Sequence, residues 1–176
     1  MNSKVSSRFS VRTIALLAMV IALNFVFARV LSIDTQFLKI NGSFLTHTLL
    51  GVLFSPAVNA VTFGLMDVVG FMLKPTGPFF PGFTLTAIIV GALYGFFYYR
   101  KEITLKRVIL ANLVITLLDS LLFTPINLMI LYQVPFWALI PARLLKVSIM
   151  IPIQVAFIYI LLPRVLKIDF LKRFID

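Results

Sequence analysis

The chain has 176 residues, of which 61% are hydrophobic and only 12% are charged, about half the charged share of a typical soluble protein. A soluble fold with this composition would expose a large apolar surface, so the sequence favours an integral membrane protein. The net charge of +10 does not indicate a nucleic-acid partner, because the basic residues lie between apolar segments rather than along one stripe.

A spanning helix needs roughly 20 apolar residues, which leaves room for about six spans in a single integral membrane domain covering residues 1–176. The predicted fold class is therefore an all-α membrane protein with six transmembrane helices in one bundle. We expect a retained first helix, because its apolar run is too long for a signal peptide. The predicted spans are residues 12–31, 43–54, 57–73, 83–99, 108–132 and 138–162.

Glycine and proline divide these spans. Residues 29–42 form a predicted polar loop, and the proline-rich and glycine-rich residues 74–82 cannot form regular helix. Gly91 and Gly95 have the spacing that permits close approach of a neighbouring helix.

Three prolines fall inside the last two spans. Pro125 predicts a kink in the fifth span, and Pro141 and Pro152 are predicted to interrupt the sixth. Residues 164–176 form a basic amphipathic tail that we expect on the membrane surface.

Six spans place both termini on one side of the membrane. Most basic residues fall on that side, and the positive-inside rule makes it the cytoplasmic face. They are Lys4, Arg8, Arg12, Arg100, Lys101, Lys106, Arg107, Arg164, Lys167, Lys172 and Arg173.

Five further cations fall at or near the opposite, outer face: Arg29, Lys39, Lys74, Arg143 and Lys146. Arg143 and Lys146 are three residues apart and so share a helix face. A cationic outer mouth suits an anionic ligand held by charge-assisted hydrogen bonds. The alternative is that these side chains only reach the lipid headgroups.

Two carboxylates lie inside apolar spans, where each costs roughly 2.5–3.5 kcal/mol unless it has a partner or a wet cavity. Asp67 can accept two parallel hydrogen bonds from an amidine-like edge such as an aminopterin ring, or it can pair with an arginine. Asp119 is predicted to join a structural polar cluster with Thr116 and Asn112.

The aromatic residues and the single histidine are less specific signals. Phe79 and Phe80 can stack on a flat heterocycle as a lid or anchor the chain at the membrane interface, and Trp137 has the same two interpretations. His47 is expected to be a helix-packing residue.

No motif for ATP binding, nucleophilic catalysis or zinc binding is present, and the chain has no cysteine. The sequence therefore favours a binding protein over an enzyme, with no metal and no cofactor.

Two strings carry a resemblance to a known family: GPFFPGFTLT at residues 77–86 and PFWALIPARLLK at residues 135–146, with residues 142–154 also matching. The chain resembles the substrate-binding S components of energy-coupling factor (ECF) vitamin transporters, most closely those specific for folate. The resemblance covers nearly the whole chain.

The resemblance implies a multi-pass protein of a prokaryotic cell membrane that captures a vitamin at its outer face. Its partners would be a membrane scaffold subunit and two cytoplasmic ATPases. The first helix of such proteins docks to the scaffold through small residues, here Ala15, Ala18 and Ala22.

Folate, with a flat pterin and a glutamate tail, fits the residues identified above, with Asp67 on the pterin and cations on the tail. The predicted ligand-binding residues are Arg29, Asp67, Phe79, Phe80, Pro81, Gly82, Asn127, Trp137, Arg143 and Lys146. The alternatives are an S component for another vitamin (a queuosine precursor, pantothenate or riboflavin), a membrane enzyme acting on lipid headgroups, and a structural assembly factor.

Overall fold

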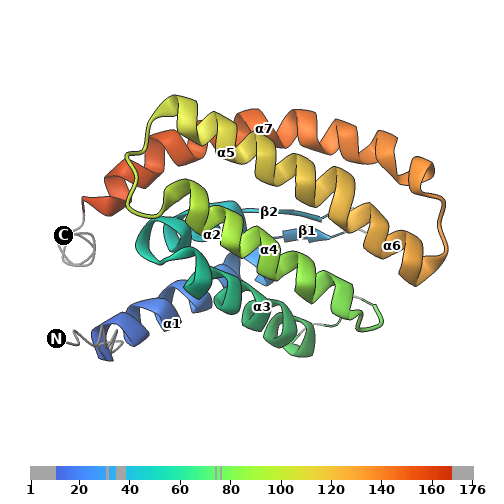
Figure 1. Ribbon diagram of the computed structural model, residues 1–176, viewed down its shortest axis with the longest axis horizontal. Coiled ribbons are helices and arrows are strands. Elements are labelled where there is room, and N and C mark those ends of the chain that lie inside the picture. The colour runs from blue at the N-terminus through green and yellow to red at the C-terminus, as the bar shows by residue number, and fades with distance from the viewer. Residues whose placement is uncertain (1–10, 31, 35–38, 74, 76, 168–176) are drawn as a thin grey trace, which may run out of the picture.

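A computed structural model describes residues 11–30, 32–34, 39–73, 75 and 77–167 (Figure 1). The elements in chain order are α1 (Val11–Phe25), the π-helical η1 (Val26–Val30), β1 (Ser32–Asp34), β2 (Lys39–Asn41), α2 (Ser43–Leu53), α3 (Pro56–Leu73), α4 (Pro81–Tyr98), α5 (Leu105–Leu117), the π-helical η2 (Leu118–Phe123), α6 (Thr124–Tyr132) and α7 (Phe136–Leu166).

The helices confirm the predicted all-α membrane class. Within the described residues, four helical segments are long and apolar enough to cross a membrane: Pro56–Leu73, Pro81–Tyr98, Leu105–Tyr132 and Phe136–Leu166. The first and second predicted spans correspond to shorter apolar helices, Thr13–Ala28 and Ser43–Leu53.

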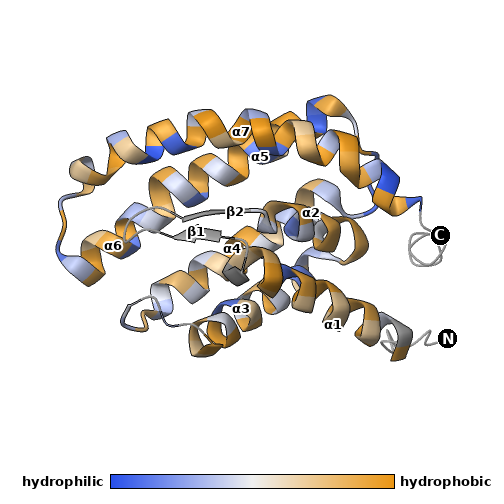
Figure 2. Cartoon of the chain, turned by 180° about the vertical axis from the view of Figure 1, so that it is seen from behind, coloured by the Kyte–Doolittle hydropathy of each residue, from blue (hydrophilic) through white to orange (hydrophobic). Residues whose placement is uncertain are grey.

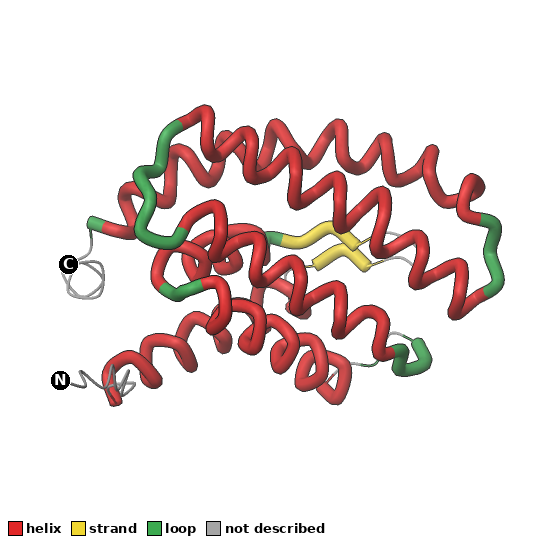
Figure 3. Tube along the Cα trace, in the orientation of Figure 1, coloured by secondary structure: helices red, strands yellow, loops and turns green. Residues whose placement is uncertain are grey.

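The connections alternate between the two ends of the molecule. The start of α1, the α2–α3 and α4–α5 turns and the end of α7 lie at one end, and the α3–α4 and α6–α7 connections lie at the other (Figures 1 and 3). The first and last described residues therefore share one end, as an even number of crossings requires. The cytoplasmic location of that end remains a prediction, and the tail beyond Lys167 lies outside the described residues.

The predicted polar loop between the first two spans contains a short antiparallel ribbon. Ile33 of β1 lies opposite Ile40 of β2, and such β-branched residues favour extended backbone. The segment is thus strand in part, which the loop prediction missed.

The prolines of the last two spans lie within continuous helices. In the helix 105–132 the π-helical residues 118–123 end two residues before Pro125, and the kink at Pro125 stays a prediction. The sixth span is not interrupted, because α7 continues through Pro141 and Pro152. Each of these prolines removes one backbone hydrogen bond while the neighbouring bonds of a membrane helix stay in place.

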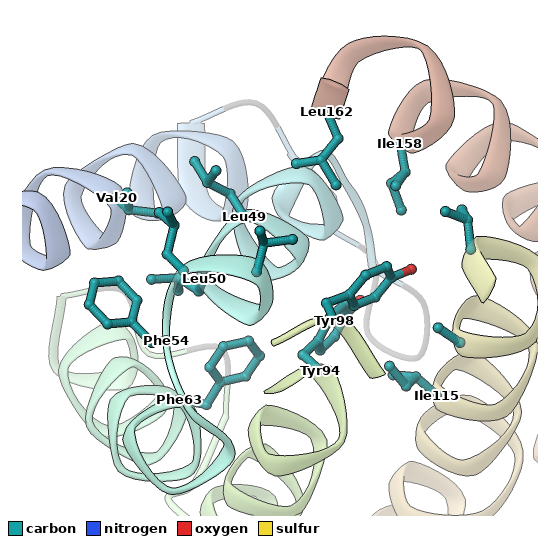
Figure 4. Packing of buried hydrophobic residues seen from close by; sticks show 14 of the residues in the cluster. Val20, Leu49, Leu50, Phe54, Phe63, Tyr94, Tyr98, Ile115, Ile158 and Leu162 are labelled. Carbon is teal, nitrogen blue, oxygen red and sulfur yellow. The ribbon is translucent and has the colours of Figure 1, made fainter. Parts of the chain in front are cut away.

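Helices α3 and α4 pack against each other over an extensive contact. A Cβ atom on Gly95 would come within 2.5 Å of the Pro56 Cα, and one on Gly91 would meet Phe63. The predicted close approach at these two glycines is confirmed. The adjoining apolar core includes the fully buried Leu50 and Tyr98 (Figure 4).

Candidate functional site

A cavity of about 510 Å³ lies between the helices and is lined by residues from α1, η1, α2, α3, α4, α5, η2, α6 and α7. Its volume lies in the range of about 300–1,000 Å³ that is typical of small-molecule sites. Most of its lining is aromatic or aliphatic, and a few charged and hydrogen-bonding side chains reach it.

One carboxylate of the lining comes from α3. The Oδ2 atom of Asp67 accepts a 2.7 Å hydrogen bond from the hydroxyl of Thr84 on α4. The predicted alternative partner was an arginine, and the partner that the structure gives is this threonine. One donated hydrogen bond leaves most of the acceptor capacity of a carboxylate available to a ligand.

The cations of the lining come from α7. Arg143 is only 4% exposed, and its Nη1 atom donates to the Ser120 carbonyl oxygen at 3.3 Å. Lys146 lies one turn further along α7 and lines the same cavity. A guanidinium has five N–H donors, so Arg143 can hold Ser120 and a ligand oxygen at the same time.

The Ser120 carbonyl is available because of the helix geometry around it. At the end of η2 the backbone N–H of Thr124 donates to the backbone carbonyl oxygen of Asp119, five residues back. The corresponding donor for Ser120 would be residue 125, which is proline and has no N–H. The sequence thus supplies Arg143 with a backbone acceptor inside the bundle.

Asp119 is the second carboxylate of the cavity. Its Oδ1 atom accepts from the Thr124 hydroxyl at 3.3 Å. The predicted cluster of Asp119 with Thr116 and Asn112 does not form: the Thr116 hydroxyl donates to Gln154, and Asn112 donates to Tyr98.

Aromatic rings cover two parts of the cavity wall. Phe79 and Phe80 line it from the α3–α4 connection, and Phe79 meets Phe71 edge-on at 5.2 Å between ring centroids. His47 lies 4.5 Å from Phe63 and 5.6 Å from Tyr94 between ring centroids. It lines the cavity as well as packing, which sequence reasoning did not predict.

Three predicted ligand-binding residues, Pro81, Gly82 and Asn127, do not line the cavity themselves. Pro81 begins α4. Asn127 donates a 2.9 Å hydrogen bond to the hydroxyl of Thr86, which in turn donates to the Gly82 carbonyl at 3.0 Å. Thr86 itself lines the cavity, so Gly82 and Asn127 position Thr86 rather than forming the surface.

Trp137 lies apart from the cavity. Its side chain is 79% exposed and is not part of the cavity lining. An exposed indole in the first turn of a spanning helix suits the membrane interface.

The remaining predicted residues are three cations, whose side chains the structure does not describe, and three alanines of α1. The side chains of Arg29, Lys39 and Lys74 lie outside the described residues, although Ala28 lines the cavity. The scaffold-docking candidates Ala15, Ala18 and Ala22 are all exposed on α1.

A helical membrane protein whose helices enclose a cavity with carboxylates, cations and aromatic rings belongs to the class of small-molecule binding proteins of membranes. Residues 12–168 match the family described as the ECF transporter, substrate-specific component. The chain belongs to this family of S components.

Relatives and a solved structure agree with this assignment. The chain is 39% identical over 143 residues to the folate transporter FolT of Clostridium novyi (strain NT), covering 81% of this chain and 83% of the relative. It is 31% identical to FolT of Streptococcus mutans, covering 96% and 94%. A crystal structure of FolT bound with folic acid is similar with a TM-score of 0.81 and 42% identity, covering 86% of this chain and 93% of that one.

Proposed function

We propose that the chain is the folate-binding S component of an ECF-type ABC importer and that it binds folate in the cavity of about 510 Å³. Three relatives that carry the name folate transporter support this proposal. The similarity to a FolT bound with folic acid supports it further.

The observation that carries the proposal is the chemistry of the cavity lining. Asp67 supplies a carboxylate from α3, and Arg143 and Lys146 supply cations from α7. Folate has the complementary arrangement, since its pterin presents adjacent N–H donors and its glutamate carries two carboxylates. Charge-assisted hydrogen bonds of this kind are the strong ones.

In this assignment Asp67 accepts two parallel hydrogen bonds from the pterin, while Thr84 holds the carboxylate in place. Phe79 and Phe80 stack on the flat part of the ligand, a contact that aromatic rings favour. Arg143 and Lys146 bind the glutamate tail, and Arg29 is a further candidate for it.

Gly82, Pro81 and Asn127 act indirectly. They fix the start of α4 and the hydroxyl of Thr86, so the ligand meets Thr86 in a set orientation. Trp137 has no role in this assignment.

Delivery into the cell needs partners, because the chain has no ATP-binding motif of its own. We propose a scaffold subunit and two cytoplasmic ATPases in the cell membrane of a prokaryote. The exposed alanines of α1, namely Ala15, Ala18 and Ala22, form the docking face, because small side chains allow helices to approach closely in a membrane.

The test is calorimetric titration of the purified full chain with folate, pteroate, riboflavin, thiamin and pantothenate. Calorimetry is preferable to tryptophan fluorescence, because the single tryptophan lies outside the cavity. Saturable binding of folate, weaker binding of pteroate and none of the others supports the proposal. Binding of another vitamin alone would replace folate with that ligand, as in the alternatives of a queuosine precursor, pantothenate or riboflavin.

A further inference from the structure

A second cavity, of about 350 Å³, lies at the α4–α5 turn and shares no lining residue with the first. Three cations line it, namely Lys101, Lys106 and Arg107, together with the rings of Phe96 and Phe97. The folate proposal makes no use of this site.

The backbone of the turn fixes one of these cations in place. Arg100 has a left-handed conformation, with a φ of 52°, which is how many helices end. The chain therefore reverses sharply, and Lys101 returns over the end of α4. Its Nζ atom donates to the Phe96 carbonyl at 2.6 Å and lies 4.6 Å from the centroid of the Phe96 ring.

The positive charge of the site is held by neutral groups. Lys101 donates to one backbone carbonyl, and Arg107 donates from Nη1 to the carbonyl of Glu102. A carbonyl orients a cation without cancelling its charge. An ammonium has three donors and a guanidinium five, so both retain donors for an anion.

An apolar strip continues from the cations along α5. Lys106, Ile109, Leu110 and Leu113 follow one another at helical spacing and so share a face. The three apolar members are exposed, Leu110 by 53%. Phe96 of α4 is also exposed, by 61%.

The result is a cationic cavity at the end of a membrane helix with an apolar strip leading away from it. Figure 2 shows hydrophilic colour near the start of α5 and hydrophobic colour over much of the helix surface. A phospholipid has the same order of parts, with a charged phosphate at the interface and acyl chains in the hydrocarbon. Basic pockets between membrane helices are suited to anionic headgroups.

We propose that the cavity at the α4–α5 turn binds the headgroup phosphate of an anionic phospholipid, with the acyl chains lying on Ile109, Leu110 and Leu113. Lys106 and Arg107 contact the phosphate, and Lys101 supports it from the end of α4. A free phosphate ion would use the cations but gain nothing from the apolar strip. The order of charge and apolar surface therefore favours the lipid.

The experiment measures lipids retained by the full chain in native mass spectrometry after equilibration with equal amounts of phosphatidylglycerol and phosphatidylcholine of the same acyl chains. The test variant is Lys106→Gln with Arg107→Gln. The matched control is Arg164→Gln with Lys167→Gln, which removes the same charge from the end of α7, at the same end of the molecule (Figure 1). Folate binding by both variants serves as the check on folding.

The wild-type chain is expected to retain phosphatidylglycerol preferentially. A direct contact between a cation and the bound phosphate contributes roughly fivefold or more, so the test variant should lose at least about 25-fold of the preference. The control removes two cations that do not line the cavity, so its loss should be several-fold smaller. An equal loss in both variants would overturn the proposal in favour of nonspecific surface charge. Displacement of the lipid by inorganic phosphate at the same concentration would point to a phosphate-ion site. An unchanged lipid preference in the test variant, with loss of association to another subunit, would make the cavity a protein contact.

Discussion

Asp67→Asn tests the proposed pterin contact most directly. Asparagine has nearly the same shape as aspartate, and its Oδ1 atom can still accept from the Thr84 hydroxyl, which lies 2.7 Å from the Asp67 carboxylate. The substitution therefore leaves the α3–α4 contact in place. It changes the group presented to the ligand from two acceptors to one acceptor and one donor.

The expected loss follows from the number of hydrogen bonds affected. A hydrogen bond to a charged group contributes about 1.5–3 kcal/mol, and Asp67→Asn weakens one such bond and abolishes the other. A total loss of about 3–4 kcal/mol corresponds to a dissociation constant for folate that is roughly 100- to 1,000-fold higher. Calorimetry of the purified chain measures this directly, and the melting temperature should stay near that of the wild type.

Thr84→Val is the matched control on the neighbouring helix. It removes the hydroxyl but keeps the carboxylate, so the lost support is a single hydrogen bond of about 0.5–1.5 kcal/mol, or roughly two- to tenfold in affinity. If Asp67→Asn binds folate as tightly as the wild type, Asp67 does not contact the pterin. A larger effect for Thr84→Val than for Asp67→Asn would mean that the pair serves helix packing instead.

Three other substitutions test separate parts of the proposal and the fold. Lys146→Met should weaken folate binding by roughly 10- to 100-fold, because one charge-assisted bond to the glutamate is lost, while calorimetry with pteroate should show little change. Gly95→Ala should lower the free energy of unfolding by about 1–3 kcal/mol, because the added Cβ would come within 2.5 Å of the Pro56 Cα. The loss should appear as a lower melting temperature. An unchanged melting temperature would contradict the close α3–α4 contact. Ala18→Trp should leave folate affinity unchanged, because Ala18 is exposed and does not line the cavity, while co-purification with the scaffold subunit should fall; retained co-purification would exclude this face of α1 as the docking site.

Charged residues in apolar segments were the sequence signal that led to the cavity. Asp67, Arg143 and Lys146 are costly in a membrane, and the structure brings all three to one cavity. His47 and Thr86 also line it, but neutral polar residues are common at helix contacts within membranes, so their spacing gave no signal.

Helix geometry explains why Trp137 lies apart from the cavity. Trp137 is nine residues before Lys146, and at 100° per residue this places the two side chains on opposite faces of α7. The prediction rested on its position within the string at residues 135–146, and that position does not indicate which face of the helix the side chain occupies. The π-helical form of residues 118–123 was not predictable in the same way, because a proline indicates a disturbance without fixing its form.

The π-helical segment η2 links Pro125 to the chemistry of the cavity. Pro125 has no N–H that could donate to the Ser120 carbonyl. In η2 the Thr124 N–H donates to the backbone carbonyl oxygen of Asp119 instead. The Ser120 carbonyl accepts from Arg143, which is almost completely buried. A neutral carbonyl orients the guanidinium without altering its charge, which suits the carboxylate contact proposed for this side chain. Pro125 thus supplies a backbone acceptor that helps to position Arg143 inside the bundle.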